Sequence, residues 1–209
     1  VPSGVTLNEE RAQYLSDRAA ETATAFSRKV EKLQNTVMDA RNNYTREAEE
    51  FITSASPEDR ATARAFAKKN AANKAANIHR QLIASSEAER AAMLKGLQAY
   101  AAEAAAIQAV YTSPATMLGR VALGEARRTH LMQQLEGAGP VELETAARTA
   151  IMTGDMVLGA AIATVIDRRP KDRRPFAVQA LAERMLGEVW KRMTAKLEGV
   201  QLAYKSAVA

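Results

Sequence analysis

Apolar residues recur every three or four positions along the first quarter of the chain, which is the pattern of one face of an α-helix. The eleven intervals average about 3.55 residues, between the heptad value of 3.5 and the straight-helix value of 3.6. The pattern therefore predicts one long, gently supercoiled helix over about 7–53, which Thr6 and Glu9 begin as a capping box. Its stripe consists of Ala12, Leu15, Ala19, Thr22, Phe26, Val30, Leu33, Val37, Ala40, Tyr44, Ala48 and Phe51.

Two further stripes have strictly alternating spacings of four and three residues. They predict coiled-coil-like helices over about 87–112 and about 175–205. Between the first two stripes, Ser56 and Pro57 are typical of a helix start, so a helix is expected over about 57–85. Ser86 and Glu89 either cap the next helix or lie inside one continuous helix. The two stripes are Met93, Leu97, Tyr100, Ala104, Ile107, Tyr111 and Leu186, Trp190, Met193, Leu197, Val200, Tyr204.

The middle of the chain has shorter patterns. Ser113 and Pro114 are expected to start a helix that runs to Gly137, where the sequence Gly-Ala-Gly-Pro interrupts it. Two short helices over about 141–153 and 156–168 follow. Gly154 suits a left-handed helix end and Asp155 suits the next N-cap, so together they predict an αα-hairpin over about 141–168.

No alternating strand pattern is present, so the predicted fold class is all-α. We expect three parts: a long-helix bundle or stem over 1–112, a compact helical part over 113–169, and a third part over 170–209. This third part holds a basic loop and a long C-terminal helix that packs on the rest.

Composition limits the class of protein. Hydrophobic residues make up 47% of the chain, aromatic residues only 5%, and cysteine is absent. Alanine supplies much of the apolar content, so little area is buried per residue, and no disulfide or thiolate chemistry is available. The first ten residues lack the apolar core of a signal peptide, and the apolar run 156–166 is too short to cross a bilayer. We expect a cytoplasmic or virion component that is not secreted by a signal peptide and does not enter a membrane.

Charge is unevenly distributed along the chain. Residues 1–56 carry seven cations and nine acids, whereas residues 170–209 carry eight cations and four acids. This pattern favours charge-complementary contacts within the chain or between copies. The net charge of +5 is too small to require a polyanionic partner.

Motifs for catalysis are missing. The chain has no nucleotide-binding loop, no H-E-x-x-H, no G-x-S-x-G and no Glu-x-x-His. The only two histidines, His79 and His130, are far apart in sequence and have no carboxylate at metal-ligand spacing. We therefore expect no enzyme, no catalytic or metal-binding residues and no cofactor.

The stretch from Arg60 to Ser86 contains six cations and no acid. Arg60, Arg64 and Lys68 share one arc of the predicted helix with Lys74, but apolar residues occupy the same arc further along. A separate row of amides is formed by Asn70, Asn73, Asn77 and Gln81. Three interpretations stay open: a solvated face, an amide-lined helix–helix contact, and direct contact with nucleic acid.

The loop 168–174 is the stronger candidate for binding a polyanion. Its cations are Arg168, Arg169, Lys171, Arg173 and Arg174. The favoured interpretation is nevertheless that they cap a helix C-terminus and pair with an acidic protein surface.

These patterns favour a non-catalytic structural or assembly subunit that acts through helix–helix packing, as a homo-oligomer or with other protein subunits, in a larger complex such as a virus or phage particle. The cysteine-free, alanine-rich composition is similar to that of helical structural proteins of tailed phages, although no diagnostic motif accompanies it. The alternative is a nucleic-acid-binding or packaging accessory protein that uses the loop 168–174 and the helix 60–80. The expected interface residues are Phe26, Val30, Leu33, Val37, Tyr44, Phe51, Met93, Leu97, Ile107, Leu186, Trp190, Met193 and Leu197.

Overall fold

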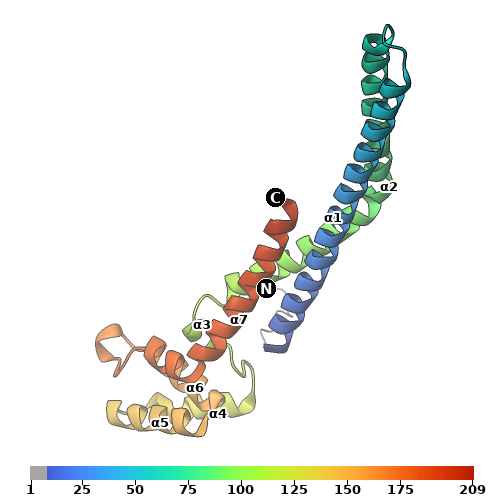
Figure 1. Cartoon of the computed structure of the whole chain (residues 1–209). Coiled ribbons are helices and arrows are strands. Elements are labelled where there is room, and N and C mark those ends of the chain that lie inside the picture. Colours follow the sequence, from blue (N-terminus) through green and yellow to red (C-terminus); the bar gives the residue numbers. More distant parts are fainter. Residues whose placement is uncertain (1–8) are drawn as a thin grey trace. The chain divides into compact units, whose positions relative to one another are not determined.

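A computed structural model describes residues 9–209, and all of its regular elements are helical, which confirms the all-α prediction. Figure 1 shows the course of the chain through these helices. Thr6 and Leu7, the predicted start of the first helix, lie outside the described residues. The elements are α1 (Glu9–Ser54), α2 (Arg60–Val110), α3 (Pro114–Leu118), α4 (Ala126–Glu136), α5 (Pro140–Thr153), α6 (Met156–Asp167), the 3-10 turn η1 (Lys171–Arg173) and α7 (Val178–Val208).

The described chain divides into two compact units. The first contains residues 9–17 and 101–201, and the second contains residues 18–100 and 202–209. Helices α1, α2 and α7 each contribute to both units. The three-part division expected from the sequence stays a prediction.

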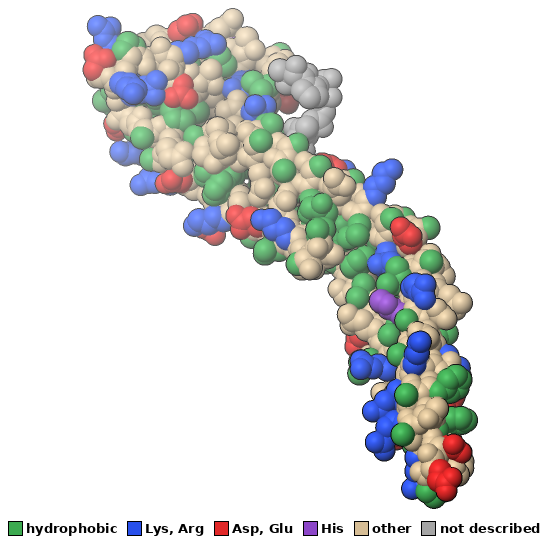
Figure 2. All heavy atoms as spheres, turned by 90° about the horizontal axis from the view of Figure 1, so that it is seen from above, with side chains coloured by type: hydrophobic (Ala, Val, Ile, Leu, Met, Phe, Trp, Pro, Cys, Tyr) green, Lys and Arg blue, Asp and Glu red, His purple; other side chains and the backbone are tan. Residues whose placement is uncertain are grey.

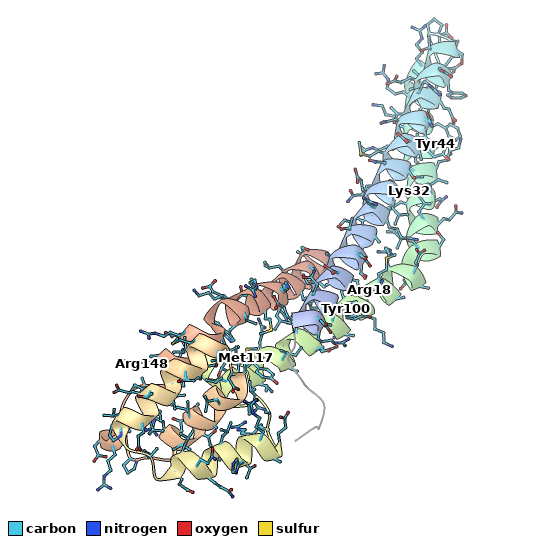
Figure 3. All side chains as sticks on the ribbon, turned by 90° about the horizontal axis from the view of Figure 1, so that it is seen from below. Arg18, Lys32, Tyr44, Tyr100, Met117 and Arg148 are labelled. Atoms are coloured by element: carbon cyan, nitrogen blue, oxygen red, sulfur yellow. The ribbon has the colours of Figure 1, made fainter. Side chains whose placement is uncertain are left out.

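The core of the first unit is built around α6, on which α3, α4 and α5 pack. Residues 159–163 of α6 are all buried, and the side of α7 that includes Leu181 and Leu186 joins the same apolar cluster. Met117, labelled in Figure 3, packs against this cluster from α3. Small residues in α6 allow its neighbours to approach closely, so this alanine-rich segment forms a core with few aromatic side chains.

The predicted αα-hairpin is present as α5 and α6. Gly154 ends α5 with a φ of 67°, in the left-handed region that glycine adopts without strain. The Asp155 carboxylate accepts the backbone N–H of Leu158 at 3.0 Å and so caps α6. This hydrogen bond and an ion pair with Arg127 lower the pKa of Asp155, because both stabilise the ionised carboxylate.

The single helix predicted between Ser113 and Gly137 is wrong. The structure has the short helix α3, an irregular turn in which Gly124 has a φ of 85°, and then α4. The buried Arg128 explains the interruption: its guanidinium donates to the carbonyls of Val121 at 2.5 Å and Gly119 at 2.9 Å. The carbonyl of Gly119 lies at the C-cap of α3 and that of Val121 lies in the turn after it. Both need a donor such as this guanidinium, because no further helical turn supplies one.

In the second unit, α1 and α2 lie side by side and antiparallel, as Figure 1 shows. We call residues 18–100 the long hairpin. Its helices are joined at residues 55–59, where the Ser56 hydroxyl accepts the backbone N–H of Asp59 at 3.3 Å. Helix α1 is unbroken from Glu9 to Ser54, as the stripe predicted, and α2 begins at Arg60.

Helix α2 continues through Ser86. Of the two arrangements that the sequence allowed, the continuous helix is therefore the one formed, in place of separate helices over about 57–85 and 87–112. The buried Ser86 hydroxyl does not cap a helix start. It donates instead to the carbonyl of Leu82, at 2.8 Å, one turn earlier. Such a bond satisfies the hydroxyl inside the helix, which explains why the capping signal has no effect here.

Candidate helix-docking surface

The apolar stripe of α1 forms the seam of the long hairpin, but the partner helix covers it only partly. Phe26, Val30, Leu33, Val37 and Tyr44 are all half-buried. Phe51, near the end of the stripe, keeps 50% of its surface exposed. Two helices alone therefore leave much of the stripe in contact with water, where apolar surface is unfavourable.

The facing stripe of α2 changes from small to large side chains along the seam. Alanines occupy it near the hairpin turn, and larger apolar residues follow. The small side chains allow close helix approach but remove little apolar area from water. The stripe consists of Ala63, Ala67, Ala71, Ala75, Ile78, Leu82, Met93 and Leu97, of which Ala67 and Leu97 are buried and the others half-buried.

Ion pairs close one side of the seam, which we call the closed flank. Lys29 of α1 pairs with Glu89 of α2, and Glu47 pairs with Lys74, with 3.3 Å between Oε2 and Nζ. Lys29 and Glu47 are 18 residues apart, which is about five helical turns, so both point to the same side of α1. Lys74 also lies over the ring of Tyr44, 5.3 Å from its centre.

The other side of the seam, the open flank, contains two adjoining grooves of about 420 and 400 Å³. Gln34, which lines one of them, is about 140° round α1 from Lys29, because five residues separate the two. Figure 2 shows hydrophobic side chains along the hairpin on a face that also exposes a histidine. The lining residues are Val30, Leu33, Gln34, Val37, Met38, Arg41, Thr45, Ala48, Glu49 and Ile52 from α1, and Lys68, Ala71, Ala72, Ala75, His79, Leu82, Ile83 and Arg90 from α2.

Large apolar side chains on the open flank are exposed to water. Met38 keeps 60% of its surface accessible and Ile83 keeps 42%. They face the groove from opposite helices, beside the half-buried Val37 and Leu82. A groove with apolar walls on both sides, along two antiparallel helices, has the shape that a third helix fills.

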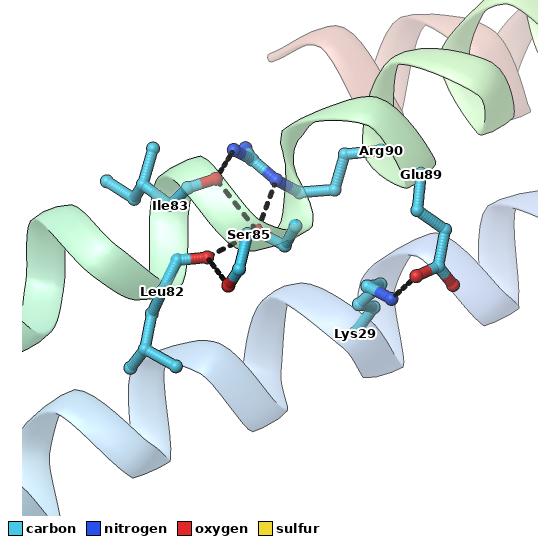
Figure 4. Close-up of polar contacts among 7 residues, drawn as sticks. Lys29, Leu82, Ile83, Ser85, Glu89 and Arg90 are labelled. Atoms are coloured by element: carbon cyan, nitrogen blue, oxygen red, sulfur yellow. Dashed lines mark hydrogen bonds and ion pairs between the residues drawn. The ribbon is translucent and has the colours of Figure 1, made fainter.

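The open flank also carries cations without carboxylate partners. Among residues 9–209, no acid lies within ion-pair distance of Arg41, Lys68 or Arg90. Arg90 is held in place by its own helix, because it donates to the carbonyl of Ile83 at 3.3 Å and to the Ser86 hydroxyl at 3.2 Å (Figure 4). Figure 4 also shows the contrast with the closed flank, where Lys29 has Glu89 as its partner.

A second exposed apolar feature lies near the hairpin turn. The rings of Phe51 and Phe66 are 6.3 Å apart between centroids and inclined at 48°. Phe66 keeps 62% of its surface exposed. This pair lies on the same side as the Glu47–Lys74 ion pair, since these four residues line one shallow pocket.

The amide row lies outside the seam. All four of its side chains, Asn70, Asn73, Asn77 and Gln81, are exposed. Asn77 accepts a hydrogen bond from Arg80 of its own helix at 2.6 Å. The row is therefore largely solvated in the isolated chain, although Asn70 lines the shallow pocket that Phe51 and Phe66 share.

The cations predicted to contact a polyanion are in different units. Arg60, Arg64 and Lys68 are exposed on the long hairpin. In the first unit, two cations of the loop act structurally: Arg169 donates to the carbonyl of Ala138 at 2.6 Å, and Arg174 donates to that of Asp167 at 2.8 Å. The loop thus caps the ends of α4 and α6, and its exposed cations are Arg168, Lys171 and Arg173.

The predicted interface residues of the first unit are used within the chain. Ile107, Leu186, Met193 and Leu197 are buried. The half-buried Trp190 donates its indole N–H to the carbonyl of Tyr111 at 3.2 Å. Whether any of the predicted interface residues act between chains stays a prediction. Of those on the long hairpin, Leu97 is fully buried, and the others retain exposed area: Phe26, Val30, Leu33, Val37, Tyr44, Phe51 and Met93.

Sequence reasoning missed Met38, Arg41, Ile83 and Arg90 as members of the candidate surface. For Met38 and Arg41 the signal was a second, weaker stripe beside the main one, in which residues 30, 34, 38, 41 and 45 recur at helical spacing. Ile83 and Arg90 lie on α2, outside that stripe. Polar members of that stripe hid it, because Gln34, Arg41 and Thr45 read as ordinary surface residues.

The described residues show no arrangement typical of a metal site or a membrane span. Among residues 9–209, no three His, Asp or Glu side chains come together in a way that would bind a metal ion. None of the helices in that range combines the length and apolar character needed to cross a bilayer. His79 and His130 lie in different units.

Comparison with known proteins gives no relative: no family model, curated protein or solved structure matches the chain.

Proposed function

We propose that the chain is a non-catalytic structural subunit whose long hairpin packs against another protein chain in a larger assembly. The observation that carries this proposal is the incomplete burial of the hairpin seam. Most of its larger apolar residues, such as Val30, Leu33 and Leu82, are only half-buried, and Met38 and Ile83 remain exposed on the open flank. Proteins that work alone rarely keep so long an apolar strip in contact with water.

A pair of helices can bury only one strip of each helix, whereas a three- or four-helix arrangement buries a wider one. Completing such an arrangement would remove Met38, Ile83 and the half-buried seam residues from water, at about 25 cal/mol per Å² of apolar area. The assembly would thus supply stability that the isolated hairpin lacks.

A virus or phage particle is the assembly that we propose. The cysteine-free and alanine-rich composition supports it, because it is similar to that of helical structural proteins of tailed phages. Long helices stabilised by neighbouring subunits suit a particle in which each chain is held by several contacts.

The alternative, a nucleic-acid-binding accessory protein, has less support. Arg169 and Arg174 are engaged with backbone carbonyls, and Lys74 is engaged with Glu47. The cations that stay exposed are divided between the two units. A low-salt retardation assay with duplex DNA separates the two functions, because phosphate binding depends strongly on salt.

The test places charges on the candidate surface of the full-length protein. Met38→Asp together with Ile83→Asp alters two exposed residues of the open flank. Val141→Asp together with Met152→Asp is the matched control, because both residues are exposed apolar side chains of the first unit. Each tagged variant is expressed in the native source, and the lysate is separated by sedimentation.

The proposal predicts that wild type and the control pair sediment with an assembly, whereas the Met38/Ile83 pair sediments as a free chain. Circular dichroism on the purified variants checks that both pairs keep the helical content of wild type. Sedimentation of the wild type as a free 22.6 kDa chain, or equal retention of all three proteins, would contradict the proposal.

A further inference from the structure

We infer that the open flank of the long hairpin binds an acidic amphipathic helix of a different protein, as the third helix of a bundle. This inference rests on the proposed function and specifies its partner. Two features of the hairpin support it. On the open flank, an apolar groove is edged by cations that have no carboxylate partner among the described residues. On the opposite flank, the cations Lys29 and Lys74 are already paired with carboxylates.

The length of the groove fits a helix. Its lining extends along α1 from Val30 to Ile52, which corresponds to about 33 Å at 1.5 Å per residue. A bound helix of about 22 residues, or three heptads, would span it. Its apolar stripe would pack on Val37, Met38 and Ile83 in the groove of about 420 Å³ and on the alanines of α2 in the groove of about 400 Å³.

The charge of the groove determines which helix fits. Its charged lining residues are Arg41, Lys68 and Arg90, with Glu49 as the only acid. Acidic residues beside the partner's apolar stripe would face these cations, as charges at the edges of coiled-coil seams do. On the closed flank, by contrast, Lys29 and Lys74 already have intramolecular carboxylate partners.

A second copy of the same groove is a poor occupant. In a two-fold symmetric contact the same patch meets itself, so Arg41, Lys68 and Arg90 of each chain would approach those of the other. One acid per groove, Glu49, cannot neutralise three cations. Like charges across an interface disfavour association.

Arg90 is well placed to face a partner. Its hydrogen bonds to the Ile83 carbonyl and the Ser86 hydroxyl fix its side chain along α2 at the groove wall. Both of these acceptors are neutral, so the positive charge of Arg90 has no acidic partner within the described residues. A carboxylate arriving with a bound helix would find the guanidinium already oriented, which lowers the entropy cost of pairing.

The test uses two synthetic peptides of about 22 residues with the same leucine stripe. Glutamate flanks the stripe in one peptide and lysine in the other, and hydrocarbon staples on the opposite face keep both helical. Fluorescence anisotropy measures their binding to the full-length protein. We expect the glutamate peptide to bind, the lysine peptide to bind at least tenfold more weakly, and added salt to weaken the glutamate complex, since screening reduces such attraction.

Charge-reversed variants locate the site. The double variant Arg41→Glu and Lys68→Glu should bind the glutamate peptide more weakly than wild type, by roughly tenfold or more, and should bind the lysine peptide more tightly. The matched control is Lys32→Glu with Lys69→Glu, which makes the same change of net charge on exposed residues outside the groove lining. The control should bind both peptides nearly as wild type does.

Three results would overturn this inference: no binding of either peptide, equal binding of both, or equal effects of the two variants. Light scattering that shows a dimer of wild type, abolished by Met38→Asp with Ile83→Asp, would identify a second copy as the occupant and would also overturn it. None of these results contradicts the proposed assembly role by itself. That role is still supported if the Met38→Asp, Ile83→Asp variant sediments as a free chain while the wild type sediments with an assembly.

Discussion

Lys74 of α2 is paired with Glu47 of α1, with 3.3 Å between the ammonium nitrogen and the carboxylate oxygen. The same ammonium lies over the ring of Tyr44 in the seam. Together with Lys29 and Glu89, this contact closes one flank of the long hairpin and leaves the other flank open. The ion pairing of the hairpin is therefore asymmetric. The flank with the ion pairs also carries the exposed rings of Phe51 and Phe66, whereas the cations that line the other flank have no carboxylate partner among the described residues.

The partial burial of the seam predicts that two nearby substitutions by alanine lower the free energy of unfolding by different amounts. Leu33→Ala removes a half-buried seam residue and should lower the free energy of unfolding by roughly 1–3 kcal/mol. Met38→Ala changes a side chain that is mostly exposed and should alter it by less than about 0.5 kcal/mol. Urea unfolding followed by circular dichroism measures both. A larger cost at Met38 than at Leu33 would show that the open flank is covered within the isolated chain.

A second prediction concerns α7 and the first unit. Leu197 keeps only 2% of its surface exposed, so Leu197→Ala should cost about 2–5 kcal/mol through lost burial and the cavity left behind. Leu202→Ala is the control, because Leu202 of the same helix is 65% exposed. Equal and small effects of the two substitutions in urea unfolding would mean that the stripe of α7 does not pack as described.

Arg128 provides a third prediction, because it is a buried cation bound to neutral groups. Besides the carbonyls of Gly119 and Val121, it donates to the hydroxyl of Thr164 at 2.8 Å. Burial lowers the pKa of its guanidinium, and Arg168 lowers it further. Arg128→Met keeps much of the apolar volume but leaves these acceptors unpaired, which should cost roughly 2–4 kcal/mol.

The control for Arg128 is its neighbour on α4. Arg127 is exposed and pairs with Asp155 at the surface, so Arg127→Met should cost less than about 1 kcal/mol. Thermal unfolding of both variants measures the difference. If Arg128→Met were as stable as wild type, the interruption between α3 and α4 would not depend on this side chain.

A fourth prediction follows from the lowered pKa of Asp155. A folded-state pKa below the unfolded value of about 3.9 stabilises the protein above that value, and the contribution is lost as the pH falls through the folded pKa. Asp155→Asn keeps an oxygen that can cap α6 but removes the titration. The stability advantage of wild type over this variant should therefore be present at neutral pH and shrink below about pH 4.

Urea unfolding at several pH values measures that difference. Asp167→Asn provides a control with a carboxylate of the same helix that is mostly exposed. A wild-type advantage at position 155 that stays constant down to strongly acidic pH would contradict the assigned role of the carboxylate.

Much of the fold could be predicted from the sequence, because long stripes of apolar residues specify helices by periodicity alone. The stripe through Leu15, Leu33 and Tyr44 defined α1 to within two residues at its described C-terminal end. Gly154 and Asp155 defined the αα-hairpin, since each residue type has a distinct backbone preference. Where the periodicity was weak, between Ser113 and Gly137, the prediction of a single helix was wrong.

The candidate docking surface could be predicted less well, because it depends on which helices face each other. The stripe of α1 was visible, but the side of the seam that is left open was not. The interruption after Leu118 depends on Arg128 meeting carbonyls seven and nine residues earlier, a tertiary contact that local sequence preference does not contain. The loop 168–174 is a similar case. Which of its cations bind backbone carbonyls and which stay exposed depends on where α4 and α6 end, and the sequence of the loop does not contain that information.

The most direct test of the central claim is site-specific photo-cross-linking at Met38 in the native source. A photoreactive side chain replaces Met38 on the open flank, and in the control it replaces Met152, which is exposed in the first unit. Our account predicts that Met38 gives one adduct of defined mass, with an acidic helical segment of another protein at the cross-linked position, and that Met152 gives no such adduct. The absence of any adduct at Met38, in cells where the chain is abundant and folded, would contradict the claim that this hairpin is a docking element.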